Sequence, residues 1–150
     1  MIRTVVNVLG AVMLIVGLVG FVSHNFMGMH LSTMHNLIHL LTGIGSLYFG
    51  IKGSDRGLRI WCRTFGLVYA LLGLVGVFTG PGTVTLHNMY GQTDSHLLKV
   101  IPTHLELGFA DSIVHILLGA VFLAMGLVPQ SVDRDLTGKT GTTKETVTTQ

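Results

Sequence analysis

Four long apolar segments alternate with short polar ones along this chain of 150 residues. The apolar segments cover about residues 5–22, 32–51, 60–79 and 107–128. Each is long enough to cross about 30 Å of hydrocarbon as a helix, and a helix satisfies the backbone polar groups within its own segment. The pattern therefore predicts an all-α integral membrane four-helix bundle over residues 1–129.

The two ends of the chain raise separate questions. Arg3 followed by an apolar run is typical of a signal peptide, but no Ala-x-Ala-like cleavage site follows. Since a matching segment occurs later in the chain, we expect the first segment to be a retained helix. Residues 130–150 are rich in Thr, Lys and Gly and have no apolar periodicity. Such a composition predicts a disordered tail, because it buries too little apolar surface to offset the entropy of ordering.

An internal repeat indicates that the bundle consists of two copies of a two-helix hairpin. Glycines and apolar residues of the first segment match those of the third at a constant offset, and His39 in the second segment matches His115 in the fourth. Two spans in each copy give both copies the same orientation. Glycines seven residues apart lie on one helix face, where small residues let helices approach closely; they are Gly10/Gly17, Gly43/Gly50, Gly66/Gly73 and Gly119/Gly126.

The basic residues predict the orientation in the membrane. Most lie at the two ends of the chain and in the loop between the second and third segments, and only Lys99 lies in the other loops. The positive-inside rule then places both termini in the cytoplasm of a multi-pass protein of the inner or plasma membrane. All eight histidines fall on the opposite, outer side: His24, His30, His35, His39, His87, His96, His104 and His115.

Composition and charge indicate the surroundings of the chain and exclude some partners. Charged residues make up 11% of the chain, against about a quarter in ordinary soluble domains, which favours lipid as the surroundings. The formal net charge of +2 is small and scattered, and this argues against nucleic acid as a partner. Cys62 is the only cysteine, so an intramolecular disulfide is excluded.

Candidate metal ligands lie near the outer ends of the second and fourth segments. His35 and His39 are four residues apart, as are Asp111 and His115, so each pair shares one helix face. The repeat predicts that these three imidazoles and one carboxylate surround a common axis, as in metal sites of helical bundles. Zinc, copper, iron or manganese would suit such ligands.

Other interpretations of the same residues remain open. A hydrogen-bonded structural or proton-relay cluster would also satisfy buried ionisable groups. Haem is a further alternative, with His39 and His115 as axial ligands. Thioethers beside imidazoles favour cuprous copper, although methionine is also common in ordinary packing; this adds weaker candidates to the possible ligands, namely Met29, His30, Met34, His87 and His104.

Residues 5–128 resemble a family of small four-helix bacterial membrane proteins that is catalogued only as a domain of unknown function. The resemblance rests on the His-Asn-x-x-His stretch from His35 to His39, on the Gly-rich third segment, and on the x-x-Asp-Ser-x-x-His stretch that ends at His115. It implies an integral membrane protein with four spans and carries no activity or ligand.

The sequence thus favours a binding or accessory protein that holds a transition metal near the outer membrane surface. The alternatives are a structural subunit of a larger membrane complex, with a non-metal His/Asp cluster, and a haem- or quinone-linked redox protein. Membrane lipid is the expected partner, together with copies of the chain or a larger complex. No nucleophile–base set, phosphate loop or catalytic carboxylate pair is recognisable, so a binding protein is favoured over an enzyme.

Overall fold

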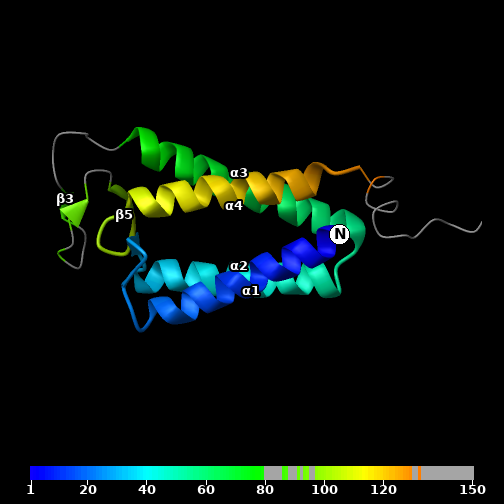
Figure 1. The fold of residues 1–150 in the computed structure, drawn as a ribbon, viewed down its shortest axis with the longest axis horizontal. Coiled ribbons are helices and arrows are strands. Elements are labelled where there is room, and N and C mark those ends of the chain that lie inside the picture. Colours follow the sequence, from blue (N-terminus) through cyan, green and yellow to red (C-terminus); the bar gives the residue numbers. More distant parts are fainter. Residues whose placement is uncertain (80–85, 88–90, 92, 95–96, 130–131, 133–150) are drawn as a thin grey trace, which may run out of the picture.

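The chain forms an elongated bundle of helices. The computed structural model describes residues 1–79, 86–87, 91, 93–94, 97–129 and 132. Within these residues there are four long helices, which lie side by side with short strands at one end of the bundle (Figure 1). The predicted tail, residues 130–150, lies outside the described residues apart from residue 132.

The helices agree with the predicted segments, with shifted ends. They are α1 (Ile2–Gly20), α2 (Thr33–Ile51), α3 (Asp55–Phe78) and α4 (Phe109–Leu127). The largest difference is at the start of α3, which was expected at about residue 60. Ser54 caps this helix by accepting a hydrogen bond from the backbone N–H of Gly57 at 3.1 Å, and a serine in this position stabilises the first turn.

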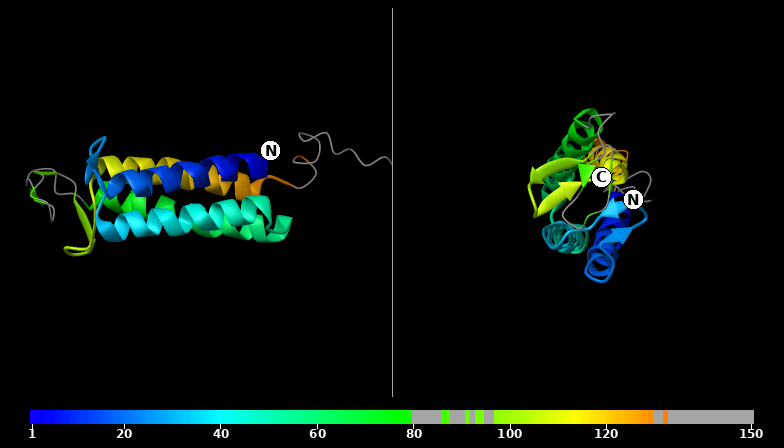
Figure 2. Two further views of the ribbon diagram at one scale, coloured as in Figure 1. Left: turned by 90° about the horizontal axis from the view of Figure 1, so that it is seen from below. Right: turned by 90° about the vertical axis from the view of Figure 1, so that its left-hand side faces the viewer.

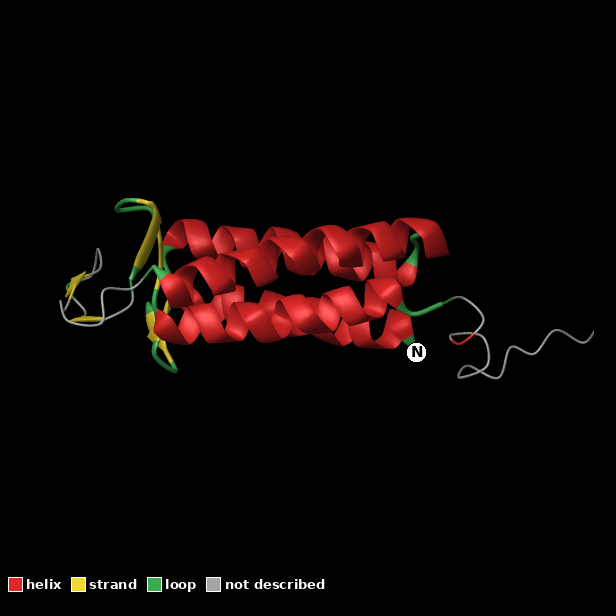
Figure 3. Cartoon of the chain, turned by 90° about the horizontal axis from the view of Figure 1, so that it is seen from above, coloured by secondary structure: helices red, strands yellow, loops and turns green. Residues whose placement is uncertain are grey.

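Short antiparallel hairpins, which the sequence pattern did not predict, lie at the end of the bundle opposite the N-terminus (Figure 3). Their strands pair as β1 with β2, β3 with β4 and β5 with β6. Strands this short have too few residues for a period of two to be recognised; their bounds are Asn25–Phe26 and Met29–His30, Leu86–His87 and Thr93–Asp94, and Leu98–Ile101 and Leu105–Leu107.

The closest helix contacts join α1 to α2 and α3 to α4, and they occur at glycines. A Cβ atom added at Gly10 would lie 3.0 Å from the carbonyl oxygen of Gly43. In the other pair, a Cβ atom added at Gly66 would lie 3.1 Å from the carbonyl oxygen of Gly119, and one added at Gly119 would overlap the backbone of Ala70. Approach this close is the role of small residues between membrane helices.

The bundle is apolar on the outside and carries many of its polar side chains inside. Ile15, Ile44 and Leu117 are more than half exposed, whereas Thr42 and Ser46 are buried. Among the described residues, three helices are long and apolar enough to cross a membrane, namely α1, α3 and α4. An apolar outer surface of this extent indicates a membrane protein.

Helix α2 is as long as α1 and α4 but is not one of the three helices that contain a sufficiently apolar stretch. Its first two turns contain His35, Asn36 and His39, which are all buried. These side chains lower its mean hydropathy, so length and composition alone do not mark it as a span. The polar residues that weaken the membrane signal are those that face the interior of the bundle.

Figure 2 shows the N-terminus at the end of the bundle opposite the hairpins, and arginine side chains bind the ends of helices there. Arg3 at the start of α1 donates to the carbonyl oxygen of Gly50 near the end of α2, at 3.1 Å. Arg63 in α3 donates to the carbonyl oxygen of Gly126 near the end of α4, at 2.9 Å. A cation at the C-terminal end of a helix is favourable because the last carbonyl groups lack helical partners.

Replacing Gly119 by Leu should destabilise the bundle by about 1–3 kcal/mol, because the new side chain would be forced against the backbone of α3. Unfolding in detergent measures the change. Ala120→Leu is a matched control, since residue 120 is exposed on the same helix. Equal stability of the two variants would show that the close contact at Gly119 does not hold α3 and α4 together.

Candidate functional site

Three buried histidines converge inside the end of the bundle that carries the hairpins. His35 and His39 come from α2, one turn apart, and His115 comes from α4. The ring centroid of His35 lies 4.5 Å from that of His39 and 5.5 Å from that of His115. The centroids of His39 and His115 are 6.2 Å apart. One ligand atom from each residue lies within 4.8 Å of the others. The predicted convergence of these three imidazoles is therefore present.

Backbone carbonyl groups orient two of the three rings. The Nδ1 atom of His35 lies 2.9 Å from the carbonyl oxygen of His30, and that of His115 lies 2.5 Å from the carbonyl oxygen of Asp111. A carbonyl oxygen can only accept, so each Nδ1 atom carries the proton in these contacts. In the neutral rings, Nε2 is then left with a lone pair, and on His35 it is buried without a hydrogen-bond partner among the described residues.

His39 differs from its two neighbours. Its side chain is 4% exposed, and neither ring nitrogen has a hydrogen-bond partner among the described residues. A buried polar group without a partner costs about 1–3 kcal/mol, and such groups in native structures call for an explanation such as an ion or a ligand. The unmet bonding capacity of the cluster is concentrated on His39.

One carboxylate oxygen of the predicted fourth ligand, Asp111, is engaged in another way, whereas its Oδ1 atom is buried without a hydrogen-bond partner among the described residues. Its Oδ2 atom accepts hydrogen bonds from the backbone N–H groups of His30 and Gly108, each at 2.8 Å. Its backbone carbonyl holds the ring of His115, and it does not belong to the group of converging ligand atoms. The carboxylate therefore joins hairpin β1–β2 to the start of α4, where N–H groups lack helical partners. Through these contacts and its own carbonyl group, Asp111 positions the histidines.

The weaker candidates are dispersed around the same end. His30 is buried, and its backbone connects Asp111 to His35. Met29 is buried in hairpin β1–β2, whereas Met34 and His104 lie together at a separate pocket. The backbone of His87 belongs to β3, but its side chain lies outside the described part of the structure.

Two residues beside the cluster were not identified from the sequence. The ring of Tyr69, in α3, stacks on His115 with a centroid distance of 5.1 Å. Its hydroxyl group donates to Oγ1 of Thr42 in α2 at 3.2 Å. Tyr69 lies in the middle of an apolar segment, where aromatic residues are ordinary, and its repeat position offers no matching polar residue. Together the two side chains link α3 to α2 beside the histidine cluster.

No family model, curated protein or solved structure matches this chain.

Replacing Asp111 by Ala should lower the free energy of unfolding by about 1.5–3 kcal/mol, because two backbone N–H groups lose a charged acceptor. Asp111→Asn should cost less, since its amide oxygen still accepts a hydrogen bond. Unfolding in detergent measures both, and Asp55→Asn at the exposed start of α3 is the control. Full stability of Asp111→Ala would show that the carboxylate does not fasten the hairpin to α4.

Proposed function

We propose that this protein is an integral membrane protein of four spans that holds a transition-metal ion at His35, His39 and His115. The fourth span is α2, whose buried face carries the polar residues and whose exposed face carries apolar ones such as Leu41 and Ile44. With 19 residues, it has a length of about 28 Å, close to that of the hydrocarbon layer.

The basic residues at the end of the bundle opposite the hairpins support an orientation with both termini in the cytoplasm. Arg3, Lys52, Arg56, Arg59 and Arg63 lie in or beside the helix ends opposite the hairpins. Because basic residues remain on the cytoplasmic side of a membrane, the histidine cluster would lie toward the outer face of the inner or plasma membrane.

We also propose that the two helix pairs are copies of one hairpin, and that the chain belongs to the family of small four-helix membrane proteins that its sequence resembles. The supporting observation is that equivalent glycines have equivalent neighbours. A Cβ atom at Gly17 would meet the carbonyl oxygen of Asn36, and one at the equivalent Gly73 would meet that of Ser112. A Cβ atom at Gly20 would likewise meet the side chain of Asn36.

The observation that carries the metal proposal is the hydrogen bonding of the histidine rings. In metal-binding histidines, the ring nitrogen that does not bind the ion commonly donates a hydrogen bond to a carbonyl or carboxylate oxygen. This hydrogen bond fixes the tautomer and orients the other nitrogen toward the ion. His35 and His115 have this arrangement through Nδ1, and His39 has no competing partner among the described residues. Three imidazoles with room for a further ligand suit zinc, copper or iron.

The alternative functions find less support in the geometry. A purely structural cluster would be expected to satisfy its polar atoms, yet both nitrogens of His39 lack partners in the described structure. Axial ligation of a haem by His39 and His115 would require space for the macrocycle that the ring of His35 occupies. A metal-binding or metal-accessory role, within this chain alone or in a larger membrane complex, is the function that we propose.

A reporter fused after Gln150 should report a cytoplasmic location, and one inserted near Thr93 should report the outside. The basic end of the bundle would then face the cytoplasm. Activity of paired reporters, such as a phosphatase and a fluorescent protein, distinguishes the two sides. A C-terminus outside the cell would contradict the orientation and the placement of the histidines.

The purified protein should bind one transition-metal ion per chain. His39→Phe fills the same space without a ligand nitrogen, so it should remove most of the bound metal while the bundle stays folded. His104→Ala, at an exposed position, is the control. Binding should weaken at acidic pH, because protons compete with the ion for the imidazole lone pairs.

Metal content, measured by mass spectrometry after dialysis against zinc, copper or iron, decides between the proposals. If metal is absent from the unmodified protein under all three conditions, the cluster is structural. If His39→Phe and the unmodified protein bind equally, the ion lies elsewhere.

A further inference from the structure

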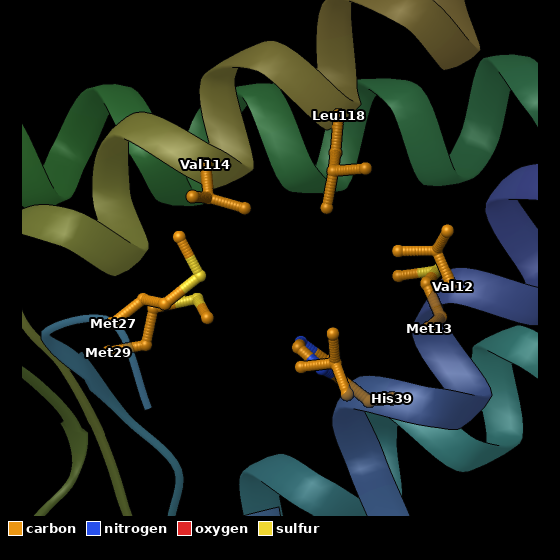
Figure 4. Close-up of a pocket in the computed structure, with 8 residues that line it drawn as sticks. Val12, Met13, Met27, Met29, His39, Val114 and Leu118 are labelled. Atoms are coloured by element: carbon orange, nitrogen blue, oxygen red, sulfur yellow. The ribbon is translucent and has the colours of Figure 1, made fainter. Parts of the chain in front are cut away.

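A cavity of about 180 Å³ adjoins the histidine cluster between α1 and α4. Its wall includes Val114 and Leu118 of α4 and Met13 of α1, and His39 of α2 is the one polar side chain among its lining residues. Figure 4 shows His39 at the edge of this space, facing Val114 and Leu118. The imidazole without hydrogen-bond partners thus borders a cavity that is otherwise apolar.

Hairpin β1–β2 supplies two thioether side chains to the same cavity. Met27 and Met29 both line it, and Figure 4 shows them on the side of the cavity where the hairpin lies. Met29 is buried, whereas Met27 is 80% exposed at the tip of the hairpin. The two methionines therefore connect the surface at the hairpin end with the interior beside His39.

The turn holds Met27 in an unusual backbone conformation. Phe26 pairs with Met29, so Met27 and Gly28 form a two-residue turn, with φ angles of 54° and 79°. Such turns favour asparagine or aspartate followed by glycine, because both central residues have positive φ. Methionine rarely adopts positive φ, and residues in sparsely populated backbone conformations cluster at functional sites.

We propose that the ion held by the histidine cluster is cuprous copper and that Met27 and Met29 form a soft entry site that passes it to His39. This inference rests on the proposed metal-binding function and specifies its metal. Thioether sulfur is a soft ligand that selects Cu(I) over zinc and other divalent ions. The step is a ligand exchange from sulfur to nitrogen, with no change in the oxidation state of the metal.

The apolar wall favours the same ion. Thioethers and neutral imidazoles carry no charge to compensate a cation, and moving a charge out of water is costly. In the Born description this cost rises with the square of the charge, so a monovalent ion enters such a cavity at a much lower cost than a divalent one. The cavity therefore distinguishes Cu(I) from Zn²⁺ by both donor type and charge.

The test uses the full chain in detergent without oxygen, with Cu(I) supplied as its acetonitrile complex against a chromophoric Cu(I) chelator. The variant Met27→Leu/Met29→Leu keeps the apolar volume and removes both sulfur atoms. The rate at which it takes up Cu(I) from the chelator should fall by roughly tenfold or more, because no soft ligands meet the ion at the hairpin. Copper X-ray absorption at one ion per chain should show nitrogen neighbours, and a second equivalent of Cu(I) should add sulfur neighbours that the variant lacks.

Two controls separate the soft site from the histidine centre. Met34→Leu changes a methionine at a different pocket and should leave the Cu(I) uptake rate and the sulfur signal unchanged. Thermal unfolding of the double variant in detergent should match that of the unmodified protein, and its final Cu(I) content at one ion per chain should be the same, which shows that the histidine cluster remains intact.

The outcomes distinguish the two proposals. If Cu(I) binds and the double variant is unaffected, the soft entry site is wrong and the histidine centre stands. If neither Cu(I) nor Zn²⁺ binds the unmodified protein, both proposals are wrong. If a short-chain quinone stabilises the protein and Cu(I) does not, the cavity belongs to a lipophilic ligand, and the copper inference is overturned.

Discussion

The close approach of helix backbones at glycines determines how this bundle is built. In hydrocarbon, apolar side chains gain nothing by leaving lipid for another apolar surface, so packing and polar contacts must hold helices together. Gly10 against Gly43 and Gly66 against Gly119 bring the partner helices into direct contact. Side chains on the remaining inner faces then meet between the two pairs. Because the interior is narrow, rings placed there are brought into mutual contact, as His35 and His115 are.

Backbone groups at helix starts and in the hairpin, more than side-chain pairs, then fix the histidines. The carboxylate of Asp111 binds the N–H group of His30, whose carbonyl oxygen holds the ring of His35. The same aspartate orients His115 through its own carbonyl group. One acidic residue at the start of α4 thereby couples the hairpin to rings on two helices. A change at this position should affect the cluster without any direct contact between the carboxylate and an ion.

The sequence could predict the four helices and the pairing of His35 with His39, because apolar length and i, i+4 spacing depend only on local order. The convergence of these two rings with His115 was predicted from the match between the second and fourth segments. The sequence could not predict that Oδ2 of Asp111 binds two backbone N–H groups. The repeat equates Asp111 with His35, but a short carboxylate near a helix start is captured by unpaired N–H groups, whereas a longer imidazole extends past them. The earlier start of α3 has a similar cause, since Ser54 and charged residues that suggested a loop form its first turn. Hairpin β1–β2 was missed because its two-residue strands carry no periodic pattern.

His39 shows how far local rules determine the site. Helix geometry places its ring beside His35 and His115, and the glycine contacts of α2 with α1 keep it buried. No neighbouring group in the described structure then satisfies its nitrogens. A protein that used this position only for packing would be more stable with an apolar ring there, because that ring would fill the space without the cost of desolvating two polar atoms. The ring of His39 lies between a histidine pair on one side and an apolar, thioether-lined cavity on the other. The Cu(I) ion that we propose would suit both sides, because it accepts nitrogen and sulfur ligands and carries a single charge.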